Sequence, residues 1–315
     1  MAKLTEVQRR RLHILEPQLL KASRLGDYET AEIVMKEIQI MLSSTEHSAR
    51  LLKNKNWFFE TALESGRVDL AIRGFEGIRK KSNKQTRNYL EATSFLAIAY
   101  IRKQKFEEAK EYITEALKSK SIQSKQRRMR FRKKLIERFE EETLLANLSG
   151  YEEKYLDEDE VYSQYVTAVQ QSNIDEMYWK IGELVPREDS DLVQSIRDFA
   201  KSQLPYDERK MLPESQKQTE AIKVGQKFFR VVGKQVWKSI CEPECNVYKL
   251  WNKGLEQFYS SNVIILQIIS VVKCYKIALV TLVAQLAAII MKLGLNVFCD
   301  MMKPSNLMEE RLKRS

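Results

Sequence analysis

A short motif that recurs three times in the first 120 residues constrains the fold of this chain more than any other feature. In each copy a turn-forming residue is followed two positions later by an apolar residue, and three positions after that by an alanine. The turn residue ends one helix, and the small alanine lets the next helix pack closely against it. Only 10 glycines and 6 prolines occur in 315 residues, which disfavours a turn-rich sheet protein. We therefore predict an all-α fold built from helical hairpins, with copies of the motif at Gly26–Ala31, Gly66–Ala71 and Gln104–Ala109.

The third copy resembles the tetratricopeptide repeat, a helix–turn–helix unit of about 34 residues. Its first helix carries Phe95–Tyr100 with Ala97 at the small position. Its second helix also fits the repeat, through Phe106, Ala109, Tyr112, Ile113 and Ala116. The two earlier copies fit more loosely, and the alanines of successive copies are 40 and 38 residues apart, longer than the period of the family. The resemblance covers roughly residues 10–120, and hairpins unrelated to the family would give the same architecture.

Stacked hairpins of this family form a curved array whose first helices line a concave face. The resemblance therefore implies a set of exposed groove positions, namely Lys53, Asn56, Glu60, Glu91, Ser94, Ile98 and Arg102. Their side chains mix acidic, basic and neutral groups. We expect such a partly basic groove to bind an extended peptide of a protein partner, one with acidic character.

The densest run of positive charge follows the hairpins and comprises Lys125, Arg127, Arg128, Arg130, Arg132, Lys133 and Lys134. The whole chain is basic, with a net charge of +10 and a sequence pI of about 9.2. Such a run is suited to the phosphate backbone of a nucleic acid or to an anionic lipid surface. Drawn as a helix, however, its basic residues cover most of the circumference, and four glutamates follow by residue 142. A solvated helix offset by these glutamates explains the run as well.

Composition divides the chain into four segments. Residues 1–150 contain the hairpins and the basic helix, and residues 151–204 contain a further helical pair after an acidic connector. Residues 205–218 include Pro205 and Pro213 with a polar stretch between them, which is typical of a linker. Residues 219–315 form a C-terminal module.

The first helix of that module carries basic residues at helical spacing, at Lys223, Lys227, Arg230, Lys234 and Lys238. Apolar residues and Trp237 occupy most of its remaining surface. A basic face opposite aromatic side chains is typical of a helix that lies in a membrane interface. A helix packed on an acidic surface of its own protein would show the same pattern.

The most apolar stretch of the chain is Val263–Cys299, which we predict to contain one long helix. Between Ile277 and Met291 it has no charged residue, and extended to Leu295 it approaches the ~20 residues that cross a bilayer. Apolar residues also recur in steps of three and four over residues 268–293, as in a coiled coil that would join copies of the chain. A transmembrane helix and a buried or oligomer-forming helix of a soluble protein both remain open. We expect the charged tail after residue 302 to lie in water.

Signatures of catalysis are missing from the sequence. It has no phosphate-binding loop, no dinucleotide-binding glycine motif, no serine-nucleophile elbow and no zinc-protease motif. There are two histidines and four cysteines without a CxxC pair, so we predict neither a metal site nor a cofactor. Cys241 and Cys245 are expected to be two reduced thiols. The N-terminus is charged and lacks the apolar core of a secretory signal, which favours a cytoplasmic location.

Two functions fit these observations. The first is a non-enzymatic helical-repeat adaptor or sensor that binds a protein or peptide partner and associates with a membrane through its C-terminal region. The alternative is a soluble basic scaffold that binds nucleic acid through residues 125–134. The sequence favours the first, because a basic amphipathic helix is followed by an uncharged apolar span.

Overall fold

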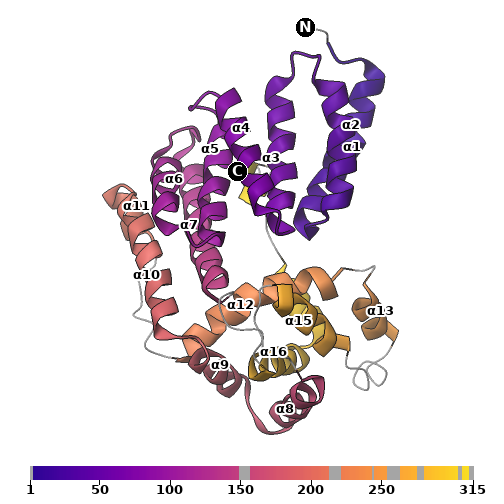
Figure 1. Ribbon diagram of the computed structural model, residues 1–315, viewed down its shortest axis with the longest axis vertical. Coiled ribbons are helices and arrows are strands. Elements are labelled where there is room, and N and C mark those ends of the chain that lie inside the picture. Colours follow the sequence, from indigo (N-terminus) through magenta and orange to yellow (C-terminus); the bar gives the residue numbers. More distant parts are fainter. Residues whose placement is uncertain are drawn as a thin grey trace. The chain divides into compact units, whose positions relative to one another are not determined.

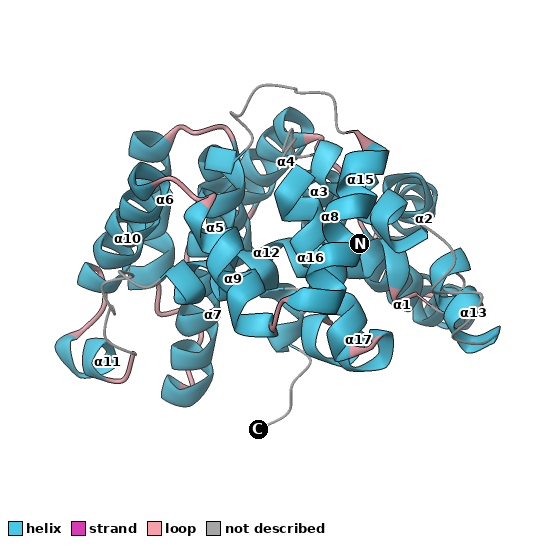
Figure 2. Ribbon diagram, turned by 90° about the horizontal axis from the view of Figure 1, so that it is seen from below, coloured by secondary structure: helices cyan, strands magenta, loops and turns pink. Residues whose placement is uncertain are grey.

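The computed structural model describes residues 3–148, 157–212, 221–242, 245–253, 263–274, 280–303 and 307–311. The regular secondary structure in these ranges is helical, and no strand occurs among them (Figure 2). The predicted all-α fold is therefore confirmed.

The chain divides into two compact units, and each collects stretches that are separated in sequence. Unit 1 comprises Met1–Glu142, Ile196–Glu214 and Ser305–Ser315. Unit 2 comprises Thr143–Ser195 and Ser215–Pro304. The predicted segments were consecutive in sequence. Sequence composition alone cannot show that the last residues pack in the same unit as the first ones.

Unit 1 begins with six helices that pack as consecutive pairs (Figure 1). The pairs are α1 (Glu6–Leu25) with α2 (Tyr28–Leu42), α3 (Ser48–Glu64) with α4 (Val68–Lys81), and α5 (Arg87–Arg102) with α6 (Phe106–Lys118). The first helices also pack on one another, α1 on α3 and α3 on α5. Three further helices contribute residues to unit 1, namely α7 (Lys125–Leu148), α10 (Arg187–Ser202) and α11 (Tyr206–Lys210).

The turns between paired helices lie where the sequence motif placed them. Gly26 and Gly66 adopt the left-handed conformation, with φ of 71° and 79°, and Gln104 does so at the third turn with φ of 57°. The alanines that follow these turns are fully buried, as close helix packing requires. Membership of the tetratricopeptide family stays a prediction.

Unit 2 is built around α12 (Ala221–Ile240) and α16 (Val280–Leu293). Around them lie α8 (Glu158–Gln171), α9 (Ile174–Glu183), α13 (Asn246–Lys253), α15 (Val263–Cys274) and α17 (Leu295–Met302). α9, α15 and α17 each contact both central helices, whereas α8 packs on α16 and α13 on α12.

Two glycines let α9 and α12 cross at very short range. A Cβ atom on Gly225 would lie 1.8 Å from the main-chain oxygen of Tyr178. A Cβ atom on Gly182 would lie 1.9 Å from the main-chain oxygen of Ala221. Both positions therefore require glycine, and its low helix propensity is offset here by the close backbone packing.

The prediction of a long apolar helix is not confirmed by the described residues. α16 ends at Leu293, Gly294 adopts φ of 79°, and α17 is bent by 106° from α16. Residues 275–279, which include part of the predicted coiled-coil seam, lie outside the described residues. Within the described helices no single one is both long and apolar enough to cross a membrane, and α16 with α17 meets that length and composition only as a bent pair.

The whole circumference of α16 lies in the core of unit 2. Residues 282–291 are all buried, and they include Gln285, which was expected on a polar face. A helix buried on every side is apolar because it packs against its own protein. Packing within unit 2 is therefore one explanation of its apolar composition.

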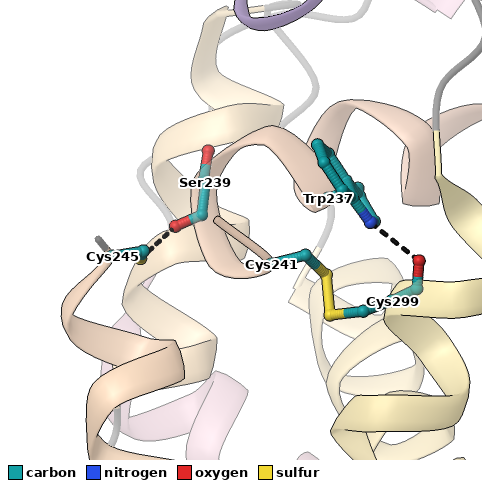
Figure 3. Close-up of a disulfide and its surroundings, with 5 residues drawn as sticks. All are labelled: Trp237, Ser239, Cys241, Cys245 and Cys299. Atoms are coloured by element: carbon teal, nitrogen blue, oxygen red, sulfur yellow. Dashed lines mark hydrogen bonds between the residues drawn. A yellow bond between two sulfur atoms is a disulfide. The ribbon is translucent and has the colours of Figure 1, made fainter. Parts of the chain in front are cut away.

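Cys241 and Cys299 form a disulfide that joins the end of α12 to α17 (Figure 3). Beside it, Nε1 of Trp237 donates to the main-chain oxygen of Cys299 at 2.8 Å. The thiol of Cys245 donates to the main-chain oxygen of Ser239 at 2.6 Å. The expectation of two reduced thiols at Cys241 and Cys245 is therefore wrong for Cys241, whose partner is 58 residues away in sequence.

Candidate functional site

The last described segment of unit 1 lies against the first helices of the paired array. It is a short 3-10 helix, η1 (Leu307–Arg311). Arg311 donates from Nε to Oε1 of Glu91 at 2.5 Å and from Nη2 to Oδ1 of Asn88 at 2.6 Å, and Nη2 also bonds the other carboxylate oxygen of Glu91. Two parallel contacts with one carboxylate are the strongest form of guanidinium pairing. Arg311 is therefore anchored on α5.

The rest of η1 is held as well. Oε1 of Glu309 accepts a hydrogen bond from Nε of Arg24, near the end of α1, at 2.5 Å. Leu307 and Met308 are buried. The expectation that the tail lies in water is wrong for these residues, because two apolar side chains within a charged tail are too few to show a periodicity. We call the surface of α1, α3 and α5 that faces η1 the groove.

The predicted groove residues lie on α3 and α5, but most are less exposed than expected. Lys53 and Arg102 are partly exposed, whereas five are buried: Asn56, Glu60, Glu91, Ser94 and Ile98. Contacts between neighbouring helices explain the burial, since Nδ2 of Asn56 on α3 donates to the main-chain oxygen of Asn88 on α5 at 3.1 Å. Among the seven, Glu91 is the residue seen to bond η1.

Glu60 is a buried carboxyl group without an ion pair among the described residues. The hydroxyl of Ser23 donates to its Oε2 at 3.2 Å. Burial, and then the nearby charge of Glu64, raise the pKa of Glu60 well above its usual value.

Arg102 belongs to a buried ion-pair network. Its Nε lies 2.6 Å from Oε2 of Glu142, and its Nη2 lies 2.7 Å from Oε1 of Glu64. Arg138 bonds the same two carboxylates. Burial acts to raise the pKa of Glu142, but the charges of Arg102 and Arg138 outweigh it and hold that pKa below its usual value. The network joins α3, α5 and α7, so Arg102 serves the packing of the array.

The predicted basic patch on α7 is smaller in the structure than in the sequence. Four of its members are exposed: Lys125, Arg127, Arg130 and Lys133. Arg132 is buried and pairs with Glu208 at 2.6 Å, and Nη1 of Arg128 donates to the main-chain oxygens of residues 122 and 123. Lys134 is partly buried. The patch therefore does not present all seven charges to a nucleic acid.

The predicted membrane-interface residues lie on α12 within unit 2. Its apolar face, with Phe228, Phe229 and Val232, packs into the core of the unit. Lys223 and Arg230 are exposed, whereas four are partly buried: Lys227, Lys234, Trp237 and Lys238. Packing on its own unit, the alternative left open by the sequence, accounts for this amphipathic pattern.

Among the described residues, no group of three or more His, Cys, Asp or Glu side chains is arranged to hold a metal ion. Comparison with known proteins gave no match to a family model, to a curated protein or to a solved structure.

Proposed function

We propose that unit 1 is the peptide-binding module of a non-enzymatic adaptor, and that the groove binds a short helical segment of a protein partner. The observation that carries this proposal is the pairing of Arg311 with Glu91 and Asn88. The segment η1 acts as an internal ligand that occupies the place of the partner. A short helix laid into a helical groove is a common mode of peptide recognition.

The contacts of η1 support a proposal for the chemistry of the partner. Arg311 of η1 donates to the carboxylate of Glu91, and Glu309 of η1 accepts from Arg24. The apolar side chains of η1, Leu307 and Met308, are buried. Each charge-assisted hydrogen bond contributes about 1.5–3 kcal/mol. The ligand we propose therefore has mixed charge and an arginine, unlike the acidic peptide expected from the sequence.

Tethering gives η1 an advantage over any partner. A segment linked to its own binding site has an effective concentration on the order of millimolar. A partner displaces η1 only when the ratio of its concentration to its dissociation constant exceeds the same ratio for the tethered η1. The free groove should consequently bind peptides more tightly than the groove of the intact chain.

The test measures binding of a fluorescent peptide with the sequence of residues 303–315 to the full-length chain. Arg311→Gln in the protein weakens the internal ligand, so we expect the peptide to bind this variant at least ~10-fold more tightly than wild type. Glu91→Gln removes the carboxylate, so it should abolish binding in the Arg311→Gln background. Lys303→Gln, at an exposed position before η1, is the matched control and should behave as wild type. Absence of peptide binding to Arg311→Gln would refute the proposal.

Membrane attachment through α16 and nucleic-acid binding through α7 are not part of the proposal. α16 is buried in unit 2, and Arg132 is committed to Glu208. A peptide-binding adaptor needs neither.

A further inference from the structure

An open cavity of about 580 Å³ lies beside the Arg311 contact in unit 1. Its wall is formed by residues of α1, α3, α5 and η1. Four cationic side chains line it: Arg50, Lys53, Arg87 and Arg311. The cavity therefore gathers positive charge from three separate elements of the chain.

Among the described residues, two carboxylates pair with these four cations. Glu16 pairs with Arg50 at 2.8 Å and lies 3.8 Å from Lys53. Glu91 pairs with Arg87 at 2.9 Å and with Arg311. Counted over the described side chains, four positive charges thus face two negative ones, an excess of two positive charges.

Two helix N-termini add to this excess. Ala49 and Arg50, in the first turn of α3, and Thr86 and Arg87, at the start of α5, all line the cavity. Neither first turn contains an acidic residue. The N-terminus of a helix carries roughly half a positive charge and is a common seat for anions.

The side chains show that the positive charge is not fully compensated. Nη2 of Arg87 is buried and has no hydrogen-bond partner. Burial, only partly opposed by Glu16, lowers the pKa of Lys53, and the charges of Arg311 and Arg50 lower it further. An anion bound in the cavity would favour the charged form of Lys53, whose pKa the surrounding cations and burial lower.

We propose that this cavity binds a phosphate dianion, either free or as a monoester. A dianion balances the excess of two charges, and its oxygens accept hydrogen bonds from guanidinium and ammonium donors around the cavity. Because Arg311 belongs to η1, the site is complete only while η1 occupies the groove. The site thus goes beyond peptide binding and makes η1 part of a second ligand site.

The test is calorimetric titration of the full-length chain with inorganic phosphate, O-phosphoserine and succinate, each at pH 7.5 and constant ionic strength. We expect saturable binding of phosphate, and weaker or no binding of the dicarboxylate succinate. Binding of phosphoserine as well identifies a monoester as the ligand, and binding of phosphate alone identifies the free ion. The site rests on η1 occupying the groove, but no peptide is added, so the titration can fail while peptide binding to the Arg311→Gln variant succeeds.

Lys53→Gln and Arg87→Gln should each weaken phosphate binding at least ~10-fold, the loss of one charge-assisted hydrogen bond. Lys55→Gln is the matched control, because Lys55 lies on the same helix and does not line the cavity. It should leave the affinity unchanged. Lack of saturable phosphate binding, equal affinity for succinate, or equal losses in Lys53→Gln and Lys55→Gln would overturn the proposal.

Discussion

Replacement of Gly225 by alanine should destabilise unit 2 much more than the same replacement at Gly233. Both glycines are buried in α12, so helix propensity favours alanine at each by about 1 kcal/mol. The new Cβ at position 225 would lie 1.8 Å from the main-chain oxygen of Tyr178. A carbon and an oxygen need about 3.3 Å, so α9 and α12 would have to separate locally by roughly 1.5 Å. No rotamer change relieves a clash with main chain, and overpacking costs about 1–3 kcal/mol or more.

We therefore expect a net loss of about 2 kcal/mol for Gly225→Ala. At Gly233 the nearest atom is Sδ of Met302, at 3.2 Å from the new Cβ, and this flexible side chain can move. Gly233→Ala should change the free energy of unfolding by less than about 1 kcal/mol. Urea unfolding followed by tryptophan fluorescence measures both, because three of the four tryptophans belong to unit 2. If Gly225→Ala is as stable as Gly233→Ala, the close crossing of α9 and α12 does not exist.

Three further predictions concern single side chains. Since the folded-state pKa of Glu60 is raised, its contribution to stability is fully present below its ordinary pKa of about 4.5 and is lost as the pH rises towards the folded-state pKa. Glu60→Gln should therefore gain stability relative to wild type as the pH increases through that window. In thermal melts, a stability difference between the two proteins that does not vary with pH would contradict this prediction. Gln104→Gly should stabilise unit 1 by about 1 kcal/mol in urea, because Gln104 has φ of 57°, whereas Lys103→Gly, at φ of −84°, should show no such gain. Cys299→Ser should lower the stability of oxidised unit 2 by up to about 4 kcal/mol, because it opens a crosslink that spans 58 residues, and a reductant should then have no further effect on the variant's unfolding midpoint.

The helical parts of the fold could be predicted from local patterns. The turns at Gly26, Gly66 and Gln104 are fixed by residues a few positions apart, so the motif located them correctly. Burial of the alanine that follows each turn has the same origin. These features depend on the preferences of neighbouring residues, which a sequence displays directly.

Features that depend on distant residues could not be predicted in the same way. The need for glycine at position 225 follows from the main chain of Tyr178, which packs against it in the fold. The disulfide partner of Cys241 likewise follows from the position of α17, which carries Cys299. The apolar composition of α16 is the same for a membrane span and for a fully buried helix, so composition alone could not decide between them.

The candidate site depended on contacts between residues very far apart in sequence. Glu91 was identified as a groove residue, but its partner Arg311 is 220 positions away in a tail that looked solvent-exposed. Burial of Arg132 likewise follows from Glu208, 76 positions away, which a count of basic residues cannot reveal. Charged residues far apart in sequence give no periodic signal that they pair.

The most direct test of the groove and its internal ligand is a double-mutant cycle between Glu91 and Arg311. Free energies of unfolding of the full-length chain are measured in urea for wild type, Glu91→Gln, Arg311→Gln and the double variant. The bidentate pairing of Arg311 with Glu91 predicts a coupling energy of at least about 1.5 kcal/mol, the lower end for close charge pairs. A coupling energy within about 0.5 kcal/mol of zero, the value for independent sites, would contradict the claim that η1 occupies the groove.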